Sequence, residues 1–205
     1  MKSIDKILGL SDDDYRNYVS NLLHEEDSLW KIDELDDELL KIVEKHSVAV
    51  ERLCRINSTV FITLDQEDMR NYALAYNFNT LMIAAIYQNN IPLSKSIFIE
   101  GITFCRENQQ FHAGQSLSNN IFKLFASNQV ALDEAPYFLK QITGFFNDLG
   151  KYQDAIEAMC AAAFYFADVS SFQSAYRTIN DAQEIAITQN LPRSQLKILE
   201  TQYIH

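Results

Sequence analysis

Leu149-Gly150-Lys151-Tyr152-Gln153-Asp154-Ala155 joins two helical patterns in this 205-residue chain. Glycine commonly ends an α-helix, because it adopts the left-handed backbone conformation without steric cost. After Gly150 the small and apolar side chains resume at helical spacing and continue to about Ala167. The stretch therefore predicts the end of one helix and the start of the next, separated by a short turn.

Breaks of the same kind recur at a regular spacing on both sides of Gly150. Turn-forming residues fall near positions 90, 109, 130, 150, 169 and 190, and apolar side chains at helical spacing fill the intervals. This placement divides residues 69–190 into three helix pairs with a period close to 40 residues. A fixed period in this range is typical of an all-α solenoid, in which each hairpin buries its apolar face by stacking on its neighbours.

The turn at Gly150 resembles the Gly-x-Tyr-x-x-Ala signature of tetratricopeptide (TPR) repeats. Gly150, Tyr152 and Ala155 match the turn residue, the packing aromatic and the small residue of that signature, and Phe172 with Ala175 is a looser second match. The resemblance implies a right-handed α-α superhelix of TPR-like hairpins. On this basis residues 65–205 are expected to form about three helix pairs followed by a C-terminal helix.

Residues 1–64 are expected to form an acidic helical cap on this array. The first fifty residues hold thirteen acidic and six basic side chains, a net charge of −7 out of −11 for the whole chain. Ser11 followed by Asp14 indicates the capped start of one helix, and a second is expected from about Ile32 or Asp33. Residues 57–64 are rich in β-branched side chains, so we expect a short strand or a loop there, with a helix as the open alternative, and a domain boundary after it.

Composition and targeting signals favour a cytoplasmic protein. An excess of acidic over basic side chains argues against nucleic acid and anionic lipid as partners, since both attract Lys and Arg. The N-terminus has no apolar run of signal-peptide length, and no segment reaches the ~20 apolar residues of a membrane-spanning helix. Cys54, Cys105 and Cys160 are dispersed in apolar runs, which indicates buried thiols in a reducing compartment.

The search for catalytic motifs favours a protein that is not an enzyme. The chain contains no dinucleotide-binding or phosphate-binding glycine loop, no G-x-S-x-G and no H-E-x-x-H. Its four histidines are far apart and lack Cys or carboxylate neighbours at metal-ligand spacing. We therefore expect no catalytic residues, no metal and no cofactor.

The TPR resemblance identifies candidates for a partner-binding groove. In that family the first helix of each pair lines the groove, and Asn side chains there pair with the backbone of an extended peptide. The corresponding polar residues here are Tyr76, Asn77, Asn79, Gln115, Asn119, Asn120 and Lys123. The alternative interpretation is that these residues form an ordinary polar helix surface.

The function expected from these observations is protein–protein interaction, as an adaptor or chaperone that holds a partner peptide or helix in a helical-repeat groove. Size, acidity and repeat number also resemble those of type III secretion chaperones. A basic partner would be drawn first to the acidic N-terminal segment, and a homodimer is a further expectation. Two alternatives stay open: a regulatory domain that senses a peptide or ligand, and an enzyme with an unrecognised site.

Overall fold

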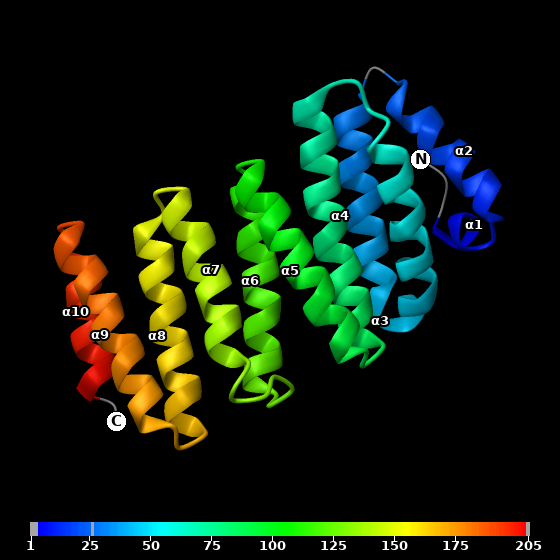
Figure 1. Cartoon of the computed structure of the whole chain (residues 1–205). Coiled ribbons are helices and arrows are strands. Elements are labelled where there is room, and N and C mark those ends of the chain that lie inside the picture. The colour runs from blue at the N-terminus through cyan, green and yellow to red at the C-terminus, as the bar shows by residue number, and fades with distance from the viewer. Residues whose placement is uncertain (1–3, 26, 204–205) are drawn as a thin grey trace. The chain divides into compact units, whose positions relative to one another are not determined.

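A computed structural model describes residues 4–25 and 27–203 of the chain. All the secondary structure in this part is helical (Figure 1). The ten helices are α1 (Ile4–Leu8), α2 (Asp12–Leu23), α3 (Ser28–Phe61), α4 (Glu67–Tyr87), α5 (Ile91–Glu107), α6 (Phe111–Ala126), α7 (Ala135–Asp148), α8 (Tyr152–Asp168), α9 (Phe172–Thr188) and α10 (Pro192–Tyr203). These helices confirm the expected all-α class. They contact mostly their neighbours in sequence, which is consistent with an array of hairpins.

The chain divides into two compact units, Met1–Leu117 (unit 1) and Ser118–His205 (unit 2), and α6 runs from one into the other. In unit 1, α3 packs on α2 and α4, and α4 packs on α5. In unit 2, α8 packs on α7, α9 and α10. The domain boundary expected after residue 64 stays a prediction.

The first predicted helix start is confirmed at Ser11. Its side chain accepts a hydrogen bond from the backbone N–H of Asp14 at 3.2 Å and caps α2, and its hydroxyl donates to the Asp14 carboxylate at 2.7 Å. The apolar face that follows buries Tyr15, Val19 and Leu22. The next helix begins at Ser28, a few residues before the expected start at Ile32 or Asp33.

Helix α3 reverses its direction at His46, whose backbone angles (φ −130°, ψ 35°) are not helical. Ser28, near one end of α3, bonds to Met69 of α4, and Ser58, near the other end, bonds to Asn77 of α4. In a straight helix the two serines would lie about 45 Å apart, whereas Met69 and Asn77 are separated by about 12 Å along α4. The segments before and after His46 therefore form an antiparallel pair against α4.

The expectation of a strand or loop at residues 57–64 is wrong for its first part. Asn57 to Phe61 belong to α3, and only the residues that follow, up to Leu64, leave the helix. Within α3, the hydroxyl groups of Ser58 and Thr59 donate to helix carbonyl groups one turn earlier, so their polar atoms are satisfied there. The apolar side chains of this segment are buried against neighbouring helices, and that packing outweighs a weak preference for strand.

Six turns between helices share one backbone arrangement. In each turn one residue has a left-handed backbone, with φ between 52° and 68°. The N–H of the following residue then bonds to the carbonyl five positions earlier, as in a Schellman helix end. The left-handed residues are Asn89, Gln109, Asn128, Gly150, Ser170 and Asn190. All six lie within the breaks expected from the sequence, which confirms the predicted turns.

Helices α7, α8 and α9 position the site described below. Helix α8 lies between α7 and α9, and its side chains Ala155, Ile156 and Ala162 have no exposed surface. Two of these residues, Ala155 and Ala162, are small and allow the flanking helices to approach α8 closely. A different set of α8 side chains faces the surface between the two flanking helices.

Candidate partner-binding groove

The structure places Asn77, one of the predicted groove residues, inside unit 1. Its side chain is only 4% exposed. The amide nitrogen donates to the carbonyl of Cys54 at 2.9 Å and to Oγ of Ser58 at 2.8 Å, both on α3. The Asn77 amide therefore joins α4 to α3, because the second half of α3 covers this face of α4.

The other predicted residues of unit 1 are also partly or fully enclosed. Tyr76 is half-buried, with its ring centroid 4.6 Å from that of Tyr72. Asn79 is buried and Gln115 is half-buried. These three side chains present little continuous surface within unit 1.

In unit 2 the predicted residues include both exposed and buried side chains. Asn119 and Lys123 are exposed, whereas Asn120 is buried. The side-chain Oδ1 of Asn120 accepts a hydrogen bond from Nζ of Lys123 at 3.0 Å. A partner-binding role for the set stays a prediction, and the exposed Asn119 and Lys123 are its most accessible members.

A second set of polar contacts joins α3 to α4 near Tyr76. Tyr72 donates to Asp33 at 2.8 Å, and Thr80 donates to Asp36 at 2.6 Å. Burial raises the pKa of Asp36 to about 7, although the Thr80 hydrogen bond acts in the opposite direction. The gap between these side chains has a volume of about 10 Å³, about the least that holds one water molecule, so the cluster is a structural contact.

The three cysteines are buried and unpaired, as the sequence predicts. Burial raises the pKa of Cys105 to about 12 and that of Cys54 well above its ordinary value. Neutral thiols in such surroundings are poor nucleophiles.

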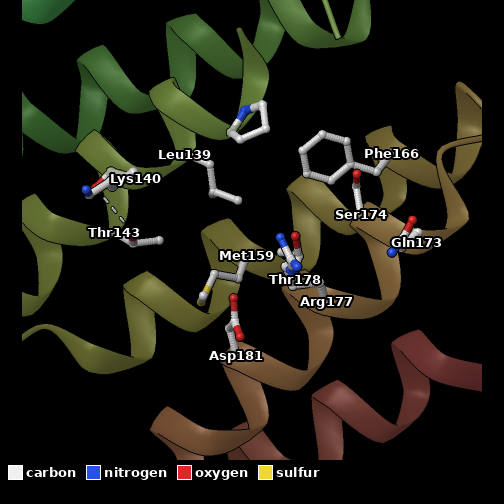
Figure 2. Close-up of a pocket in the computed structure, with 11 residues that line it drawn as sticks. Leu139, Lys140, Thr143, Met159, Phe166, Gln173, Ser174, Arg177, Thr178 and Asp181 are labelled. Atoms are coloured by element: carbon white, nitrogen blue, oxygen red, sulfur yellow. Dashed lines mark hydrogen bonds between the residues drawn. The ribbon is translucent and has the colours of Figure 1, made fainter. Parts of the chain in front are cut away.

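A surface trough in unit 2 runs between α7 and α9 and has a volume of about 430 Å³. Figure 2 shows Leu139, Lys140 and Thr143 of α7 on one side, Arg177 and other α9 residues on the other, and Met159 of α8 between them. Its remaining lining residues are Pro136, Phe166, Gln173, Ser174, Thr178 and Asp181. Apolar side chains form the floor of this trough, and polar side chains form its rim.

A second trough, of about 420 Å³, continues the first toward the C-terminal ends of α7 and α9, and Asp181 lines both. Its other lining residues are Asn147, Tyr152, Glu184, Ile185, Thr188 and Gln189. Tyr152, Met159 and Phe166 of α8 line the two troughs at intervals of seven residues, which places them on one face over about 21 Å of helix. We call the two troughs together the α7–α9 groove.

The charges of the α7–α9 groove are separated along its length. Lys140 and Arg177 lie in the first trough, Asp181 lies where the troughs meet, and Glu184 lies in the second. None of these four side chains makes an ion pair with another described residue. One end of the groove is therefore basic and the other acidic, and each charge is available to an occupant.

Asn147 adds an unused hydrogen-bond acceptor to the second trough. Its Oδ1 is buried and has no hydrogen-bond donor among the described residues. A buried polar atom without a partner costs free energy, so a donor brought by an occupant would be favoured there.

Sequence reasoning missed this groove because the TPR resemblance assigned binding to the first helix of each pair. The walls of the α7–α9 groove come from second helices, and only the floor comes from a first helix. The recurrence of Tyr152, Met159 and Phe166 every seven residues was the available signal. It was hidden among the many other apolar residues of α8.

Two searches of residues 4–25 and 27–203 bear on the class of protein. No group of three or more His, Cys, Asp or Glu side chains could hold a metal ion. None of the helices in this part of the chain is both long and apolar enough to cross a membrane. No family model, curated protein or solved structure matches the chain.

Proposed function

We propose that this chain is a protein–protein interaction module, an adaptor or chaperone, that holds a segment of a partner protein in the α7–α9 groove. One observation supports this proposal above the others: a floor of one aliphatic and two aromatic α8 side chains lies between two walls that carry unpaired charged side chains. In such sites the floor supplies apolar contacts, and the polar rim supplies hydrogen bonds and orientation.

The wider architecture is part of the same proposal. The helix pairs form a TPR-like right-handed superhelix with residues 1–64 as its cap, and the protein acts in the cytoplasm. The Gly150 turn supports the TPR-like assignment, because Gly150 has a left-handed backbone (φ 68°), and the close-packing residue Ala155 is fully buried. The acidic residues before position 50 give a basic partner a first point of contact.

In this function the groove replaces water around apolar side chains of the partner. Leu139, Met159 and Phe166 are almost fully buried within unit 2, and each exposes only a small part of its surface in the groove. A partner that inserts two or three apolar side chains covers these parts and gains about 25 cal/mol for each Å² of apolar surface removed from water.

Site-specific photo-crosslinking in the native host tests the proposal. A benzophenone amino acid placed at Gln173, on the exposed rim of the groove, is expected to form a covalent adduct with one partner protein. The same amino acid at Arg193, an exposed position on α10 outside the groove, is the matched control. Equal adducts from both positions, or none from Gln173, would exclude the groove as the partner-binding site.

A further inference from the structure

We infer that the occupant of the α7–α9 groove is an extended peptide segment with an acidic side chain at the Lys140–Arg177 end and a basic side chain at the Asp181–Glu184 end. This inference rests on the proposed interaction function and names the kind of segment that the groove takes. Its support comes from the length of the groove, the polar groups along it and the order of its charges.

The length of the first trough suits a short extended segment. The trough extends over about 12 Å of α9, from Gln173 to Asp181, and has a volume of about 430 Å³. At about 3.3 Å per residue, an extended chain spans that length in three or four residues.

The polar groups along the groove suit an extended backbone. The N–H and C=O groups of an extended segment need partners, whereas those of a helix are already bonded to each other. Gln173 and Ser174 line the first trough, and the amide of Asn147 lines the second. Since Oδ1 of Asn147 has no donor among the described residues, it is the natural acceptor for a main-chain N–H of the occupant.

The order of charges fixes the pattern of the occupant. Arg177 precedes Asp181 by four residues and Glu184 by seven, which corresponds to about 6 to 10 Å along α9. An extended segment covers that distance in two or three residues, and a helix covers it in four to seven. The occupant therefore carries its acidic and basic side chains two or three residues apart, with apolar side chains facing Met159 and Phe166.

Selection from a phage-displayed library of random dodecapeptides on the full chain tests this pattern. The expected peptides carry Asp or Glu two or three residues from Lys or Arg. The double variant Lys140→Glu with Arg177→Glu should remove the enrichment of acidic residues and weaken a selected peptide at least tenfold. Arg193→Glu, a single charge reversal on α10 outside the groove, should change neither. Lys140, Arg177 and Arg193 are exposed, so circular dichroism is expected to show the same fold for all the proteins.

Methylation of single backbone nitrogens in a selected peptide tests the main-chain contact. One methylated position should bind the natural chain about fivefold to tenfold more weakly, the effect of one lost hydrogen bond. In the Asn147→Ala variant, methylation at that same position should not weaken binding of the peptide any further.

The outcomes separate this inference from the proposed function. Selected peptides with helical spacing of their charges, or peptides insensitive to the Lys140 and Arg177 changes, would overturn the extended, charge-ordered occupant. If photo-crosslinking at Gln173 still captures a partner in that case, the interaction function stands alone. A library that yields no peptide, together with no adduct at Gln173, would overturn both.

Discussion

Exchanging glycine and non-glycine residues at the left-handed turn positions should change stability in opposite directions. At Gly150 an added Cβ would meet no atom within 4 Å, so Gly150→Ala changes only the backbone energies. A left-handed backbone costs a residue with a Cβ about 1–2 kcal/mol, and the reduced freedom of the unfolded chain returns about 0.4–1 kcal/mol. We expect Gly150→Ala to lower the free energy of unfolding by about 0.5–1 kcal/mol.

Ser170→Gly applies the same reasoning in reverse. Ser170 is exposed and has φ 61°, so glycine relieves the strain and should stabilise the fold by about 0.5–1 kcal/mol. Ser170→Ala keeps a Cβ at positive φ and is the matched control. Its free energy of unfolding is expected to lie within about 0.5 kcal/mol of that of the natural chain. Urea and thermal unfolding measure these differences, which correspond to about 1–4 °C in Tm. A loss of stability in Ser170→Gly, or equal effects of Ser170→Gly and Ser170→Ala, would refute the reasoning.

Three further substitutions test packing in unit 1. Asn77→Ala should lower the free energy of unfolding by about 1–3 kcal/mol, because it breaks two buried hydrogen bonds to α3. The control Asn119→Ala, at an exposed position in unit 2, should change the free energy of unfolding by less than about 0.5 kcal/mol. Similar losses in both variants would contradict the structural role of Asn77. Gly101→Val should lower the free energy of unfolding, measured in urea, by about 1–3 kcal/mol, since a Cβ there would lie 2.8 Å from Cδ1 of Leu117. An unchanged free energy of unfolding would show that this contact relaxes freely. Because the fold raises the pKa of Asp36 from 3.8 to about 7, it favours the protonated carboxyl, so stability should fall as the pH rises from about 4 to 7. Asp36→Asn should reduce the decrease of Tm between about pH 4 and pH 7. An unchanged decrease of Tm would mean that other titrating groups cause the pH dependence.

The helices and turns could be predicted because they depend on local signals. The six breaks were visible as runs of Asn, Gln, Ser and Gly, and all of them became left-handed turns. The stretch at 57–61 was missed because its helical state depends on burial against other helices, which the sequence does not display. The reversal at His46 was missed for a related reason, since no glycine or proline marks it.

The candidate site was much harder to predict than the fold. Asn77 has the composition of a binding residue, yet its amide bonds to a segment about twenty residues earlier that the sequence did not place beside it. Conversely, Lys140 and Arg177 are ordinary surface residues in sequence, and only the packing of α7 and α9 on α8 brings them to one groove. Phe172, a packing residue by resemblance, is 65% exposed at the start of α9.

The shared turn geometry also determines how a chain of this kind can change its length. Each left-handed residue follows the previous one by 19 to 22 positions, and the chain reverses direction at each. Loss of one helix would invert the direction of every helix after it, whereas loss or duplication of two restores the original direction. Length changes in steps of about 40 residues are therefore compatible with the existing turns.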